Sequence, residues 1–248
     1  MELGAGGPVW YGEPLMNPAL ATSPGLPLRI VELRRYVTFP DARDVLIDIF
    51  DREFVETQEA CGMVPLGHFR DLDDPNAFVW FRGFPRMEMR RDALDAFYTS
   101  PAWKANSKAA NATMVDSDNV LLLRNARPDS GFDVLGLVRP AADASGSLAT
   151  SFVAVAIFSL EEPADEEYLA AFERGTLPSV RACAQRLAYF VTEERPNDYP
   201  ALPIRDGHWF VVAGTCAGES ELAEWQRTFS DVPCEVLRLA PARRSLLR

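Results

Sequence analysis

The sequence predicts an α+β fold made of two tandem units, and three observations support this prediction. Strand-like and helix-like segments follow the order β-α-β-β-α-β over residues 28–124. The same order recurs over residues 150–248, although the residues themselves differ. A segment rich in Pro, Gly, Ala and Ser separates the two, at residues 125–149. This element order is that of the ferredoxin-like split βαβ unit, in which two helices cover one face of an antiparallel sheet.

The elements of the first unit follow from periodicity and from turn residues. Apolar residues alternate with polar ones in the expected strands and recur at helical spacing in the expected helices. Asp41 and Gly62 are typical of the start and the end of a helix. We expect a strand at 28–39, a helix at 41–62, a hairpin at 66–84, a helical stretch at 86–113 broken near Pro101, and a strand at 117–124.

The second unit is predicted in the same way, with a long loop between its second and third strands. Gly175 and Pro178 indicate an irregularity in its first helix. We expect strands at 151–160, 187–194, 207–216 and 234–241, and helices at 164–186 and 219–229. Residues 1–27 contain several prolines and glycines and no periodicity, so they are predicted to form an extended arm whose Trp10 and Tyr11 dock on the body or a partner.

Composition excludes several classes of protein. The 248 residues carry a net charge of −11, which disfavours binding to nucleic acid or to an anionic membrane. No apolar run approaches the ~20 residues of a membrane span, and the first residues lack the pattern of a signal peptide. The cysteines (Cys61, Cys183, Cys216 and Cys234) are widely spaced, which favours buried thiols over a disulfide framework or a zinc site. We therefore expect a cytoplasmic protein.

Three stretches of the first unit carry a family resemblance. They are VELRRYVTFPDARD, FRDLDDPNAFVWFRGF and FYTSPAWKANSKAANATMVDSDNVLLLR, at residues 31–44, 69–84 and 97–124. Together they resemble the NIPSNAP family, and residues 151–248 are similar, more weakly, to the downstream half of two-domain bacterial members. The resemblance implies the dimeric α/β-barrel superfamily, in which the sheets of two ferredoxin-like units pack together. The sequence leaves open whether the two paired sheets belong to two halves of one chain or to two separate chains.

Alternation along the strands predicts which side chains face a cavity between the sheets. We expect the small apolar residues of each strand to pack on the helices, among them Val31, Leu33, Val79 and Phe81. In the second strand, Leu66 and His68 are expected to share a face. The side chains left for the face without helices are Glu32, Arg34, Tyr36, His68, Trp80 and Arg82.

These residues supply the candidate site. We predict His68, Arg82 and Glu32 as catalytic residues, with His68 moving a proton and Arg82 holding an anionic oxygen. The substrate-binding candidates are Arg34, Tyr36, Trp80, Tyr98, Trp103 and Lys104. Two alternatives stay open: Glu32 and its arginines are a structural ion pair, or His68 is a structural residue or a haem or metal ligand.

The function that these residues favour is that of a cofactor-independent enzyme of specialised metabolism. It would be an isomerase, cyclase, lyase or monooxygenase acting on a hydrophobic or aromatic substrate, without metal or cofactor. The resemblance also implies a homodimer. The alternatives are a non-catalytic small-molecule binding or sequestration protein and an assembly scaffold. The motifs of the common nucleotide-binding and hydrolase classes do not occur in the sequence.

Overall fold

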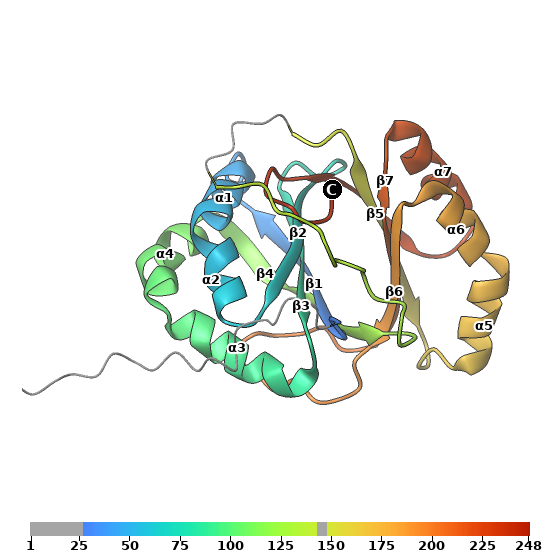
Figure 1. Ribbon diagram of the computed structural model, residues 1–248, viewed down its shortest axis with the longest axis horizontal. Helices are drawn as coiled ribbons and strands as arrows, with labels where there is room; N and C mark the ends of the chain where they lie inside the picture. The colour runs from blue at the N-terminus through green and yellow to red at the C-terminus, as the bar shows by residue number, and fades with distance from the viewer. Residues whose placement is uncertain (1–26, 143–147) are drawn as a thin grey trace, which may run out of the picture.

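The computed structural model describes residues 27–142 and 148–248. Eight antiparallel strands close into a barrel with helices on two opposite sides (Figure 1). The predicted arm at residues 1–27 lies almost wholly outside the described residues.

The first unit contains β1 (Ile30–Thr38), α1 (Arg43–Ile49), the π-helix η2 (Phe50–Phe54), α2 (Val55–Ala60), β2 (Val64–Asp71), β3 (Ala77–Phe84), α3 (Met87–Thr99), α4 (Pro101–Asn111) and β4 (Met114–Asn125). The second unit contains β5 (Phe152–Leu160), α5 (Glu166–Gly175), α6 (Leu177–Cys183), β6 (Arg186–Thr192), β7 (His208–Cys216), α7 (Glu219–Phe229) and β8 (Glu235–Pro241).

Both units have the same strand order, so the prediction of two tandem ferredoxin-like units is confirmed. The order around the barrel is β1-β3-β2-β8-β5-β7-β6-β4. The two sheets join edge to edge, through residues 69–71 of β2 with 239–241 of β8 and through residues 123–125 of β4 with 190–192 of β6. The barrel therefore closes within one chain. The exact domain boundaries expected from the sequence stay predictions, as does the homodimer.

The interior of the barrel is packed with apolar side chains. Val31, Leu33 and Phe81 from the first sheet meet Val155 and Val211 from the second in one buried cluster. The sequence prediction placed the first three against the helices, and that assignment is wrong. Alternation separates the two faces of a strand, but it does not say which face the helices cover. Here the charged face lies under the helices, because those helices carry its partners.

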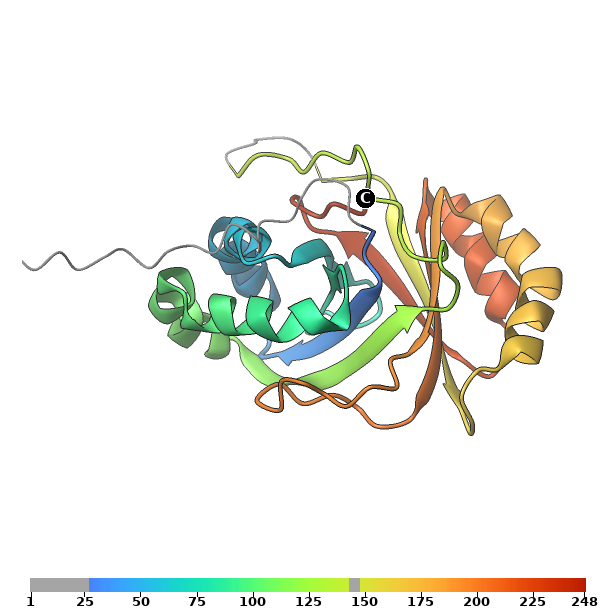
Figure 2. The ribbon, with the colours of Figure 1, turned by 60° about the horizontal axis from the view of Figure 1, so that its bottom comes forward.

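Helices α1, η2, α2, α3 and α4 cover the outer face of the first sheet, and α5, α6 and α7 cover the second (Figures 1 and 2). Each layer has its own core, centred on residues such as Phe78 in the first unit and Phe210 in the second. The linker and the chain's last residues also contribute to the interior cluster, through Phe132 and Leu247. Within the described ranges, no helix combines the length and apolar character that crossing a bilayer requires.

Two local irregularities decide how the first unit presents its side chains. The helix predicted at 41–62 is interrupted by η2, where Phe50 and the adjacent Asp51 are both buried. Strand β2 has a bulge between Pro65 and Gly67, which adds one residue to its alternation. As a result Leu66 joins the barrel interior, whereas His68 points to the helices. The expectation that these two residues share a face is therefore wrong.

Candidate functional site

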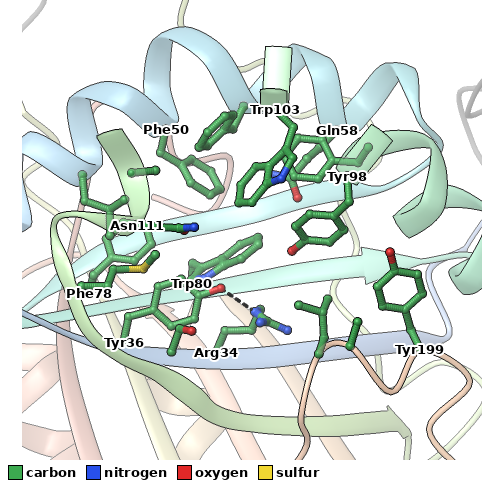
Figure 3. A pocket seen from close by; sticks show the side chains of 18 residues that line it. Arg34, Tyr36, Phe50, Gln58, Phe78, Trp80, Tyr98, Trp103, Asn111 and Tyr199 are labelled. Atoms are coloured by element: carbon green, nitrogen blue, oxygen red, sulfur yellow. Dashed lines mark hydrogen bonds between the residues drawn. The ribbon is translucent and has the colours of Figure 1, made fainter. Parts of the chain in front are cut away.

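A cavity of about 360 Å³ lies between the outer face of the first sheet and its helices (Figure 3). This volume falls within the range of pockets that hold drug-sized ligands. The cavity is outside the barrel, on the strand face that alternation predicted, wrongly, to point between the two sheets. It is lined by Arg34, Tyr36, Leu46, Phe50, Phe54, Gln58, Phe78, Trp80, Phe97, Tyr98, Trp103, Ala110, Asn111, Met114, Ser117, Tyr199, Ala201 and Leu202.

Half of the residues that line the cavity are aromatic. On the strand side, Tyr36 and Trp80 meet edge to face with ring centroids 6.0 Å apart. On the helical side, Tyr98 and Trp103 meet edge to face at 4.8 Å. Tyr199 stacks on Tyr98 at 6.0 Å. Such walls suit a flat, apolar ligand, because aromatic pairs gain energy beyond simple burial.

Part of the wall comes from the second unit. The loop at residues 193–207 leaves β6 and runs across to the first unit (Figure 2). It brings Tyr199, Ala201 and Leu202 to the cavity, and Asn197 and Asp198 accept hydrogen bonds from Nη1 of Arg90 on α3. The site is therefore completed by a loop that lies far downstream of the first unit's last strand in the sequence.

A buried ionic cluster lies behind the floor of the cavity. Glu32 is fully buried and accepts from three arginines: Nη1 of Arg34 at 2.9 Å, Nη2 of Arg82 at 2.5 Å and Nε of Arg90 at 2.7 Å. Burial opposes ionisation of Glu32, but the charges of Arg82, Arg34 and Arg90 outweigh it, so the pKa of Glu32 is lowered. The three guanidinium groups therefore keep Glu32 ionised at neutral pH, and its contacts are those of the ion-pair alternative.

The cluster has an excess of positive charge. Within the described ranges its three arginines pair with only two carboxylates, those of Glu32 and Asp198, which leaves a net charge of about +1 in a buried setting. Nη1 of Arg82 and Nη2 of Arg90 are buried without a hydrogen-bond partner in the described part of the chain. An uncompensated buried cation is costly, so the arrangement favours an additional anion nearby.

Arg34 is the member of the cluster that reaches the cavity. Its Nε donates to the hydroxyl oxygen of Tyr36 at 2.8 Å, and its guanidinium lies 5.5 Å from the ring centroid of Trp80. With Nη1 on Glu32, its Nη2 has no hydrogen-bond partner among residues 27–142 and 148–248. Burial raises the pKa of Tyr36 against the opposing charge of Arg34, so the phenol stays protonated at neutral pH.

His68 lies beside the cavity but does not line it. Its Nε2 is 2.5 Å from Oδ1 of Asp51, and its ring packs on Phe50 with centroids 4.8 Å apart. Its backbone N–H donates to Oγ of Ser245, in the chain's last residues. Burial lowers the pKa of His68, although Asp51 opposes this shift. Nδ1 of His68 is buried without a hydrogen-bond partner within the described ranges, and His68 belongs to no group of three or more potential metal ligands there.

The predicted site residues thus separate into three groups. Five of the six substrate-binding candidates line the cavity: Arg34, Tyr36, Trp80, Tyr98 and Trp103. Lys104 is exposed on α4 and does not. The catalytic candidates Glu32, Arg82 and His68 are buried next to the cavity without lining it, so their catalytic roles stay predictions.

Sequence reasoning missed several cavity residues. Gln58, Asn111 and Ser117 are polar residues in helical or strand segments, and nothing in their spacing distinguishes them from surface positions. Tyr199 belongs to PNDYPALPIRDG, which lies in the predicted loop of the second unit and carries part of that unit's weaker resemblance to two-domain family members. Its tyrosine among prolines is the one sequence signal that could have pointed to the site.

These observations define a dimeric α/β barrel fused into a single chain, with its cavity under the helices of the first unit. Residues 31–126 match the family model described as NIPSNAP, which confirms the resemblance for the first unit. No curated protein matches the chain by sequence.

Solved structures show the same fold. The chain is similar to a provisionally assigned monooxygenase from Fusobacterium nucleatum subsp. nucleatum, with a TM-score of 0.54 and 8% identity over 86% of this chain and 92% of that one. It is also similar to an anthrone oxidase-like protein, with a TM-score of 0.53 and 11% identity over 88% and 94% of the two chains. At such low identity these likenesses support the fold, and function is argued from the site.

Proposed function

We propose that this protein binds a hydrophobic, aromatic small-molecule anion in the cavity of its first unit. The observation that carries the proposal is the buried excess of positive charge, which reaches the cavity through Arg34. A carboxylate or phenolate oxygen at Nη2 of Arg34 would neutralise that excess. The aromatic walls formed by Tyr36, Trp80, Tyr98 and Trp103 would hold the ring system.

The preference for an anion follows from the chemistry of the guanidinium group. Arginine keeps its charge in a buried site, and its donors fit a carboxylate in a forked geometry. A hydrogen bond to a charged group contributes about 1.5–3 kcal/mol, roughly twice that of a neutral one. A neutral ligand of the same shape would leave the excess charge of the cluster in place, so it should bind more weakly.

Calorimetric titration with two isosteric probes tests the proposal. We expect 2-naphthoate to bind about tenfold more tightly than its neutral amide, 2-naphthamide, a difference of about 1.4 kcal/mol. Arg34→Met should abolish this preference, and Arg34→Lys should keep part of it. Glu32 retains Arg82 and Arg90 in both variants, so the fold is expected to persist.

The neighbouring arginine supplies a matched control. Arg35 follows on the same strand, faces the other way, and pairs with Glu235. Arg35→Met should leave the preference for the acid unchanged. Equal affinity of the wild type for acid and amide would refute the proposal, as would an unchanged preference in Arg34→Met. Mass spectrometry of ligand that co-purifies with the protein provides an independent readout.

A second candidate function is that of a cofactor-independent enzyme, and one observation favours it. The hydroxyl of Tyr36 accepts from Nε of Arg34, so its own hydrogen is free to point into the cavity. A protonated phenol beside a guanidinium can give a proton to a developing enolate and stabilise its charge. Such a pair supports isomerase, cyclase or lyase chemistry. Loss of turnover in Tyr36→Phe, with ligand affinity retained, would distinguish catalysis from binding alone.

A further inference from the structure

Gln58 is a buried polar residue whose side-chain amide has no hydrogen-bond partner among residues 27–142 and 148–248. It lies on α2, is 1% exposed, and lines the cavity. Its Oε1 is buried without a hydrogen bond, and its Nε2 makes none with any residue that the structure describes. Its backbone carbonyl accepts from Cys61 and Met63, so the hydrogen bonds that Gln58 gives to the described fold come from its main chain.

An unpaired carboxamide in an aromatic wall is unfavourable for the folded protein alone. Buried amides are almost always hydrogen-bonded, and replacing an unpaired one by an apolar side chain of similar shape is neutral or stabilising. A methionine at this position would fill the same volume without an unpaired group. The side chain of Gln58 is therefore better explained by a group that enters the cavity than by packing.

The position of Gln58 is complementary to that of Arg34. Figure 3 shows Gln58 on the helical side, near Trp103 and Tyr98, and Arg34 on the strand side. A flat ligand lying between the two sides can therefore reach both polar groups at once. Arg34 offers a charged donor, and Gln58 offers an acceptor and a donor in one carboxamide.

We propose that the ligand is an aromatic carboxylate that also bears a hydroxyl group, with the carboxylate at Arg34 and the hydroxyl at Gln58. This inference rests on the proposed function and names the ligand class of the same cavity. A hydroxyl fits Gln58 because it can donate to Oε1 and accept from Nε2. A binding site that hydrogen-bonds a hydroxyl group discriminates against the analogue that lacks it, because the protein's polar group is then left unpaired.

Matched probes test the assignment by calorimetric titration. We expect 6-hydroxy-2-naphthoate to bind the wild type about tenfold more tightly than 2-naphthoate, and 6-methoxy-2-naphthoate to show no such gain. In Gln58→Met the affinity for 2-naphthoate should be retained, and the hydroxyl preference should fall below about twofold. Gln226→Met, an exposed substitution on α7, should behave as the wild type.

The outcomes separate this inference from the proposed function. Binding of 2-naphthoate without a hydroxyl preference, or the same preference in Gln58→Met, overturns the role of Gln58 alone. Failure of all three acids to bind the wild type refutes the proposed function and this inference together. A melting temperature of Gln58→Met at or above the wild-type value supports the ligand role. A clearly lower melting temperature would identify Gln58 as a structural residue and overturn its inferred role in ligand binding.

Discussion

Replacing Glu32 by glutamine should destabilise the protein more than removing any one of its arginines. Glu32 is fully buried and accepts four hydrogen bonds, from Arg34, from two nitrogens of Arg82 and from Arg90. In Glu32→Gln the three guanidinium groups face Asp198 alone, so the buried net charge rises from about +1 to about +2. The glutamine's own N–H groups also point toward donors.

The expected magnitude follows from other buried ion pairs. Removing one partner of such a pair costs about 3–5 kcal/mol, because a charge is left uncompensated. That is a large share of the roughly 5–15 kcal/mol by which domains are stable. Arg82→Met changes the charge of the buried cluster in the opposite direction and brings its net charge near zero. It leaves Glu32 with Arg34 and Arg90, so we expect a smaller cost, about 1–3 kcal/mol.

Urea unfolding of the two variants and of the wild type, followed by tryptophan fluorescence, measures both costs. An unchanged dependence on urea concentration would show that the same structure unfolds in each case. The reasoning is refuted when Arg82→Met costs as much as Glu32→Gln, or when Glu32→Gln costs less than about 1 kcal/mol. Either result would mean that the cluster is already neutral or open to water.

Two further predictions concern the bulged strand β2. Because burial lowers the pKa of His68 below its ordinary value of 6.5, the unfolded state takes up a proton first, so stability should fall as the pH drops below 6.5. Urea unfolding at several pH values measures this dependence. The decline should be absent in His68→Gln and present in the control His208→Gln; an equal slope of stability against pH in the two variants would contradict the assignment. Gly67→Ala should cost about 1–3 kcal/mol, because a Cβ there would lie 2.3 Å from Cζ of the buried Phe69, whereas Gly175→Ala, which meets nothing within 4 Å, should be harmless. Thermal unfolding of both variants checks this, and equal melting temperatures would show that the Phe69 ring can move aside.

Much of the fold could be read from the sequence, because periodicity reports directly on secondary structure. The strands of both units and the break before Pro101 follow from alternation and from helix-breaking residues. The π-helix η2 and the bulge at Gly67 could not be anticipated, since each depends on contacts made after the chain folds. Asp51 is turned toward His68 only in the folded unit.

The candidate site shows the same limit. The residues Arg34, Tyr36, Trp80, Tyr98 and Trp103 line one cavity, because they occupy one strand face and the helices α3 and α4 above it. Their direction was predicted wrongly. A barrel of this kind has two buried faces, and both can accept large side chains, so alternation alone does not distinguish the inside of the barrel from the layer under the helices.

The sequence by itself determined the two ferredoxin-like units, their element order and, on the strands β1 and β3, the residues that share a face. Local periodicity encodes these features, and they require no long-range contact. Only the tertiary structure decided that the two sheets close into one barrel, that the charged face lies under the first unit's helices, and that Tyr199 of the second unit completes the cavity. The physical reason is that Glu32 is stabilised by Arg90 of α3, and Arg90 in turn by Asp198, across separations that no local pattern records.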